Sequence, residues 1–171
     1  MITPDTKNWT WVLERPCPEC GLDTRPVRGG DVPALLRENA AAWLPVLERP
    51  GVRERPAPDV WSPLEYACHV RDVFRIFDER LRLMLTEDDP AFPDWDQDAT
   101  AVAERYGEQD PRRVAGELSE AGEALAARLA AVAGEQWERT GTRSDGSRFT
   151  VESLARYMIH DPVHHLHDVH G

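Results

Sequence analysis

The last stretch of the chain, residues 149–171, reads FTVESLARYMIHDPVHHLHDVHG and holds five of the chain's six histidines. Thr150 is a typical helix-capping residue, and apolar residues recur behind it at the spacing of a helix face. They are Val151, Leu154, Ala155, Met158 and Ile159. The stretch therefore predicts a terminal helix whose last turns carry the histidines, and a functional site is expected there.

The helical projection separates the histidines into two groups. At about 100° per residue, Asp161 and His165 lie four residues apart at the edge of the apolar stripe and are neighbours on one side of the helix. His160 and His164 point largely the other way. Pro162 complicates this projection, because a proline inside a helix costs about 3 kcal/mol and usually kinks it. Asp161 and His165 are the predicted inward pair, and His160 with His164 is the alternative.

Composition narrows the class of protein. A chain of 171 residues forms one domain with its own core. The net charge of −11 repels a phosphate backbone, and no basic stripe offsets it, so no nucleic-acid partner is expected. No apolar run reaches the roughly 18 residues of a membrane helix, and no signal peptide is evident. The three cysteines fit a reducing compartment. We expect a cytoplasmic protein that acts on a small molecule. The composition does not decide between a monomer and a homodimer.

Residues 1–30 are rich in proline and end in two glycines, which predicts an irregular extension. Its centre, CPECG, places Cys17 and Cys20 in a Cys-x-x-Cys pair followed by glycine, which resembles one knuckle of a structural zinc site. A knuckle provides only half of the ligands. The others would come from His167, His170 or Cys68. The alternative is that both thiols are free or packed in the core.

The rest of the chain predicts an all-α fold. Apolar residues at helical spacing, preceded by capping signals, indicate long helices at about residues 31–48, 62–86, 110–133 and 150–170. Ser62-Pro63-Leu64-Glu65 is the clearest start signal, a capping box with proline at the first helical position. No convincing alternating strand is present. Residues 31–171 should form a four-helix bundle of the up-down-down-up type, with ligands projecting inward from facing helices.

Two features lie between and on these helices. Residues 88–98, DDPAFPDWDQD, form an acidic, proline-broken loop that is a candidate lid, followed by a short helical piece at residues 99–106. His69 lies at the edge of the apolar stripe of the second helix. A lone histidine there is usually a hydrogen-bonded core residue, but the terminal histidine cluster favours a metal ligand.

His69, Asp161 and His165 are the predicted metal ligands. Imidazole nitrogen and carboxylate oxygen are donors that a borderline divalent ion accepts, and an i,i+4 pair plus a third group from a facing helix gives three-point capture. The open position would let the ion lower the pKa of a bound water or thiol. In the alternative reading, Asp161 caps the helix or pairs with an arginine and the histidines decorate the surface.

These residues carry a resemblance to the DinB superfamily over roughly residues 31–171. The matching positions are Trp61-Ser62, Glu65, His69 and Asp72 on the second helix and Asp161-x-x-His164-His165-x-x-x-Val169 on the last. The resemblance implies a four-helix bundle that holds nickel, zinc or a similar ion through a histidine of the second helix and an i,i+4 pair of the fourth, usually in H-x-x-H-H. Here Asp161 stands where most members have the first histidine, and a glutamate stands there in the isomerase branch.

The resemblance also suggests an activity. The superfamily includes bacillithiol transferases and mycothiol-dependent maleylpyruvate isomerase, which implies a metal-dependent thiol transferase or isomerase that activates a low-molecular-weight thiol such as mycothiol. A metal-dependent hydrolase would use the same ligands with water, and a non-catalytic bundle that binds a metal or small molecule is the third reading. No catalytic residue beyond the ligands is assigned from the sequence.

Overall fold

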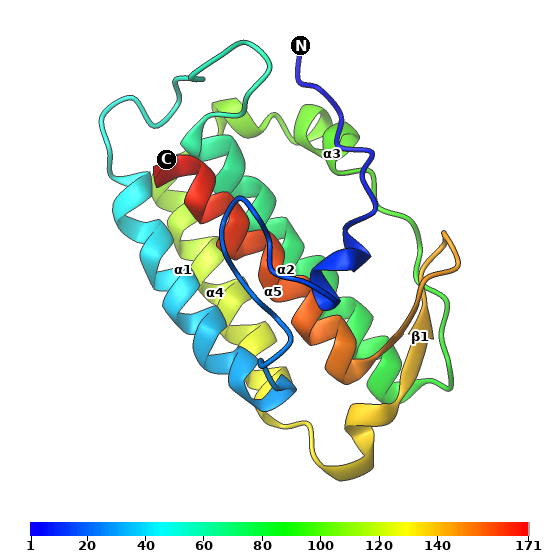
Figure 1. The fold of residues 1–171 in the computed structure, drawn as a ribbon. Coiled ribbons are helices and arrows are strands. Elements are labelled where there is room, and N and C mark those ends of the chain that lie inside the picture. Colours follow the sequence, from blue (N-terminus) through cyan, green and yellow to red (C-terminus); the bar gives the residue numbers. More distant parts are fainter. Residues whose placement is uncertain (171) are drawn as a thin grey trace.

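Four long helices form a bundle in the structure, a computed structural model that describes residues 1–170 (Figure 1). They are α1 (Val32–Leu47), α2 (Pro63–Thr86), α4 (Pro111–Ala130) and α5 (Val151–His170). Helices α1 and α5 run in one direction and α2 and α4 in the other. Both α4 and α5 pack against α1 and α2. The predicted all-α bundle of the up-down-down-up type is therefore confirmed, and Gly171 lies outside the described residues.

The helices begin where the capping signals predict. At the start of α2, the Ser62 hydroxyl accepts a hydrogen bond from the Glu65 N–H at 3.2 Å, and Glu65 accepts one from the Ser62 N–H at 2.8 Å. These bonds satisfy two of the N–H groups that a helix leaves unpaired at its start. Helix α4 ends at Ala130, three residues before its expected end, whereas α5 continues past Pro162 as one helix.

The connection between α2 and α4 crosses the bundle. Because these neighbours are parallel, the chain must return along their length before α4 begins. The returning segment contains α3 (Gln97–Ala103) and a 3-10 turn at Tyr106–Glu108. Helix α3 ends earlier than the sequence suggests, and Arg105 then takes a left-handed φ of 50°. The predicted lid, residues 88–98, belongs to this segment and runs back along α2, from the C-terminal end of that helix to Trp95, which stacks on His69.

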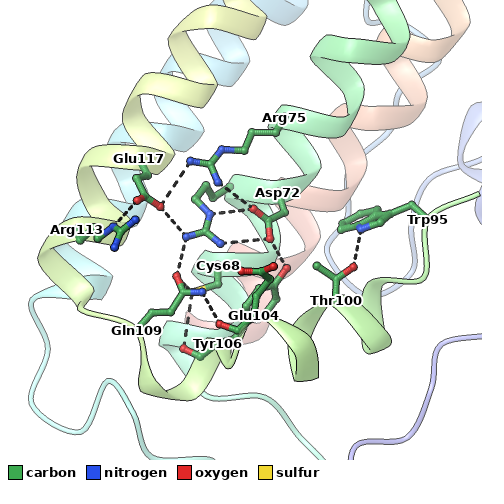
Figure 2. A network of polar contacts seen from close by, with 11 residues as sticks. Cys68, Asp72, Arg75, Trp95, Thr100, Glu104, Tyr106, Gln109, Arg113 and Glu117 are labelled. Atoms are coloured by element: carbon green, nitrogen blue, oxygen red, sulfur yellow. Dashed lines mark hydrogen bonds and ion pairs between the residues drawn. The ribbon is translucent and has the colours of Figure 1, made fainter. Parts of the chain in front are cut away.

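A network of polar side chains holds the returning segment in place (Figure 2). The buried guanidinium of Arg71 donates to Asp72 at 2.9 Å, Gln109 at 2.7 Å and Glu117 at 2.8 Å. The Tyr106 hydroxyl donates to the same Asp72 carboxylate. The network therefore links α2 with the 3-10 turn and with α4, and it satisfies a charge that would be costly to bury alone.

A short hairpin, absent from the sequence prediction, precedes α5. Strands β1 (Thr140–Thr142) and β2 (Arg148–Thr150) pair antiparallel, with Gly141 opposite Phe149. A Cβ atom at Gly141 would lie 2.5 Å from the ring of Phe92, so glycine is needed there for the ring to pack. Phe92 is buried and belongs to the predicted lid, so the hairpin supports the base of that loop. Three-residue strands are too short to show alternation in the sequence.

The N-terminal extension folds onto the bundle. It contains a 3-10 turn (Trp9–Leu13) that packs against α5. Inside it, the buried Thr24 hydroxyl donates to the Val12 carbonyl at 2.6 Å, and Arg156 of α5 donates to the Thr24 carbonyl at 3.0 Å. The extension thus lies across one face of α5. No helix in the described part of the chain is long and apolar enough to span a membrane.

Candidate metal centre

Three side chains from α2 and α5 converge on one point. Nε2 of His69 lies 3.1 Å and Nε2 of His165 lies 3.2 Å from the same Oδ1 atom of Asp161. Metal–ligand bonds of about 2.0–2.2 Å, at angles between about 90° and about 109°, place neighbouring donors about 2.8–3.6 Å apart. The structure thus brings together the residues that the sequence singled out as ligands, with donor atoms and spacing that fit a divalent ion.

A further carboxylate orients one of the imidazoles. Oδ2 of Asp168 lies 2.9 Å from Nδ1 of His165, so the Nδ1–H donates to it and Nε2 is left to face Asp161. This arrangement is typical of histidines that bind metals. Asp168 was missed in the sequence reasoning, although its i,i+3 spacing from His165 is a signal that could have revealed it.

The charges of this cluster depend on one another. Burial alone would raise the pKa of Asp161, but His69 and His165 hold it well below its usual range. Burial alone would lower the pKa of His165, but the charge of Asp161 and the hydrogen bonds to Asp161 and Asp168 raise it to about 9. A proton on His165 therefore balances Asp161 at neutral pH, and a metal ion would take the place of that proton.

Aromatic rings enclose His69. The Trp95 ring stacks on the His69 ring with centroids 5.6 Å apart and planes at 5°, and Trp61 lies on it at 5.2 Å. Trp95 is fixed by a 2.9 Å hydrogen bond from its Nε1–H to the Thr100 hydroxyl (Figure 2). The predicted lid therefore reaches the metal centre through Trp95, a contact that the sequence did not indicate.

A cavity of about 520 Å³ opens beside the cluster, between α2, α5, the loop at residues 94–98 and the N-terminal residues 4–9. Arg80 on its wall is only 7 % exposed and has no ion-pair partner among the described residues. Its guanidinium lies over the rings of Phe77 and Phe92. Burial, together with the charge of Arg143, lowers the pKa of Arg80. The cavity therefore combines a metal centre with a poorly solvated positive charge.

His160 and His164 lie on the other side of α5. They are buried beneath the extension, 4 % and 8 % exposed, rather than displayed on the surface. Their ring nitrogens and the sulfurs of Cys17 and Cys20 all come within 4.8 Å of one another. The alternative in which His160 and His164 take the places of Asp161 and His165 beside His69 therefore does not match the structure, since α5 turns the two pairs to different sides despite Pro162.

The groups that the sequence suggested as further partners of the cysteine pair lie elsewhere. Cys68 faces the Tyr106 carbonyl and the Gln109 side chain, and burial raises its pKa to about 12. His170 contacts Arg49, and His167 is exposed. His167 lies on the same side of α5 as His164 but about one turn further along, and the cysteines meet His160 and His164 instead.

Comparison with known proteins agrees with the observed fold. The sequence pattern of the DinB superfamily matches residues 33–169. The structure of YfiT from Bacillus subtilis, described as a probable metal-dependent hydrolase with an unusual four-helix bundle topology, is similar with a TM-score of 0.73 and 22% sequence identity. The likeness covers 81% of this chain and 82% of YfiT. None of the curated proteins matches the chain in sequence. Because this match covers residues 33–169, well over half of the chain, the chain belongs to the DinB superfamily.

Proposed function

We propose that the chain is a metal-dependent thiol transferase or isomerase, which activates a low-molecular-weight thiol such as mycothiol for attack on an electrophile. The observation that carries this proposal is the convergence of three potential metal ligands, His69, Asp161 and His165, beside a cavity of about 520 Å³. An ion held by three protein ligands would keep one coordination position open, which is typical of catalytic rather than structural sites.

The donor set suits zinc or nickel, and such an ion lowers the pKa of a water or thiol that binds to it. The protein's own groups have separate tasks. His69 and Asp161 hold the centre from facing helices, and Asp168 keeps His165 in the tautomer that presents Nε2. Trp95 shields His69 from water, which strengthens electrostatic interactions at the centre.

The substrate is proposed to carry a carboxylate or a similar small anion. Arg80 has no ion-pair partner among the described residues, although an isolated buried charge is costly. Arg143, by contrast, already pairs with Asp145 at 2.6 Å and donates to the Tyr157 hydroxyl at 2.9 Å. An anionic group in the cavity would pair with the Arg80 guanidinium and set the orientation of the substrate.

Hydrolysis is the second candidate, since YfiT is described as a probable metal-dependent hydrolase and the same open position accepts water. Turnover separates the two. Metal-free and zinc- or nickel-loaded protein would be given mycothiol, bacillithiol or glutathione with a chromogenic electrophile, and separately p-nitrophenyl esters. Metal-dependent conjugation supports the transferase, and ester cleavage without thiol supports the hydrolase. If metal-loaded protein catalyses neither reaction, the chain is a non-catalytic binding protein.

A spectroscopic test does not depend on the choice of electrophile. In cobalt-substituted protein, a thiol that binds through sulfur should lose its proton and add a sulfur-to-cobalt charge-transfer band. Cys20→Ser protein is the suitable background, because it removes a thiolate contribution from the extension. His69→Ala should remove both the band and the proton release, while His167→Ala, at an exposed histidine of the same helix, should keep them. If no thiol gives either signal in fully loaded protein, the transferase proposal fails.

A further inference from the structure

Four potential metal ligands meet where the CPECG turn crosses α5, away from the centre of His69, Asp161 and His165. They are Cys17, Cys20, His160 and His164, whose ligand atoms all lie within 4.8 Å of one another. Two thiols and two imidazoles are the donor set of closed, four-coordinate zinc sites. None of these residues takes part in the function proposed above.

The spacing within the cluster suits a tetrahedral ion. Sγ of Cys17 lies 3.6 Å from Nδ1 of His164. Zinc–sulfur bonds of about 2.3 Å and zinc–nitrogen bonds of about 2.0–2.1 Å at tetrahedral angles place sulfur and nitrogen about 3.5–3.6 Å apart. A zinc ion would therefore fit between these atoms with little movement of either side chain.

Neighbouring groups prepare the imidazoles for a ligand. Nε2 of His164 lies 3.2 Å from the Glu19 carboxylate, so its N–H donates there and Nδ1 keeps a free lone pair on the side of Cys17. Nε2 of His160 is buried and has no hydrogen-bond partner among the described residues. A buried polar atom left unpaired in a native structure calls for an explanation, and a bound ion supplies one.

The cysteine turn has the form of a zinc knuckle. The Gly21 N–H donates to the Cys17 carbonyl and the Cys17 N–H donates to the Leu22 carbonyl, each at 2.9 Å. Gly21 has a left-handed φ of 76°, which glycine adopts without steric cost. The turn thus brings both sulfurs to one side, toward α5.

We propose that Cys17, Cys20, His160 and His164 bind a structural zinc ion that fixes the N-terminal extension to α5. The ion would also shape the cavity of the metal centre. Trp9 packs on the rings of His160 and His164 at 5.4 and 5.5 Å, and it lines the cavity together with Asp5 and Lys7. Zinc at this site therefore holds one wall of the substrate cavity, on a segment that precedes the DinB-like part of the chain.

Metal content of the purified full-length protein tests the proposal. Elemental analysis should find about two metal equivalents per chain, with about one lost in Cys20→Ser and a different one lost in His69→Ala. Cys68→Ser is the matched control, because Cys68 is buried against Tyr106 and Gln109, and its metal content should equal that of wild type. Helical circular dichroism of each variant checks that the bundle still folds.

Two measurements remain informative if Cys20→Ser folds poorly. Cobalt-substituted His69→Ala protein should show a sulfur-to-cobalt charge-transfer band in the absence of added thiol, since the proposed thiolate ligands belong to the chain itself. Hydrogen exchange should be faster at residues 9–24 of wild-type protein after the metal is removed, and unchanged in α4. Exchange that is equal with and without metal in residues 9–24 would contradict a structural role.

The outcomes separate this proposal from the proposed function. Equal zinc in wild type and Cys20→Ser, or a Cys17–Cys20 disulfide in the freshly purified protein, would overturn the zinc knuckle while leaving the centre of His69 intact. Loss of metal from Cys20→Ser but not from His69→Ala would have the opposite meaning: the knuckle would stand and the catalytic centre would fail.

Discussion

Nδ1 of His165 lies 2.9 Å from a carboxylate oxygen of Asp168, one turn further along α5. Through this contact, a residue that is not a predicted ligand determines which nitrogen of His165 faces Asp161. The hydrogen bond to Asp168 thus fixes the orientation of the His165 imidazole before any ion binds.

Replacing Asp168 should therefore weaken metal binding without removing a ligand. We expect Asp168→Ala to lower the metal affinity of the centre by about 10- to 100-fold, the range found when the carboxylate partner of a ligating histidine is lost. Isothermal titration with zinc in the Cys20→Ser background measures this centre alone. Asp78→Ala is the control, since Asp78 pairs with Arg128 away from the centre and should leave the affinity unchanged. Wild-type affinity in Asp168→Ala would contradict the orienting role.

Substitution of the proposed ligands on α2 and α5 should show which side chains bind the ion. His69→Ala and His165→Ala should each abolish metal at this centre and leave most helical circular dichroism intact, because the apolar stripes carry the bundle core. Asp161→Ala should lower the affinity more than His160→Ala, since His160 lies beneath the extension instead. The reverse ranking would mean that Pro162 rotates the last turns of α5 and that the observed faces are wrong.

Arg80 should matter for anion binding and little for folding. Leucine has a volume similar to that of arginine but carries no charge. The Arg80→Leu variant therefore loses a poorly solvated charge, and its ligand-free melting temperature should equal or exceed that of wild type. Binding of a small dianion such as maleate, followed as a thermal shift, should weaken by about tenfold or more because the guanidinium pairs with it. Arg82→Leu is the control, an exposed arginine of the same helix that pairs with Glu79. If maleate shifts the melting temperatures of Arg80→Leu and Arg82→Leu equally, Arg80 does not bind the anion.

Protonation of Glu65 at low pH should reduce the stability that this residue gives to the start of α2. Burial alone would raise the pKa of Glu65, but hydrogen bonds from Arg55 and the Ser62 N–H lower it. A carboxyl with a lowered folded-state pKa adds stability above its unfolded pKa of about 4.3, and this stability is lost as the pH falls through the folded-state pKa. Glu65→Gln should therefore cost about 1–3 kcal/mol at pH 7 and much less in strong acid.

Urea unfolding of wild type and Glu65→Gln at neutral and acidic pH measures this difference. Glu79→Gln provides the comparison, because Glu79 also pairs with an arginine but on the exposed surface, where such pairs contribute little. A stability difference for Glu65→Gln that is independent of pH would show that the carboxylate charge is not the source of its effect.

Much of the architecture was predictable because its signals are local. The capping box of Ser62 and Glu65 acts over three residues, and the apolar stripes repeat within each helix, so helix starts and buried faces can be predicted from the sequence. The two sides of α5 follow from the same periodicity, which separated Asp161 and His165 from His160 and His164. Local rules failed where elements are short, as at the β1–β2 hairpin and the early end of α3, and they placed the end of α4 three residues too late.

Partners that are distant in sequence could not be predicted in this way. Cys17 and His164 lie 147 residues apart in the chain, and nothing near either one specifies the other. Trp95 meets His69 only because two parallel helices force their connection back across the bundle. The absence of an ion-pair partner for Arg80 among residues 1–170 likewise depends on side chains that are distant in the sequence.

The amino-acid sequence by itself determined the four helices, their buried faces and the residues from which a metal centre could be built. The tertiary structure alone decided which further residues meet: Trp95 with His69, and the cysteines of the extension with His160 and His164. The physical reason is that periodicity and capping act over one or two turns, whereas a coordination site requires atoms a few ångströms apart whose positions depend on the packing of the whole chain.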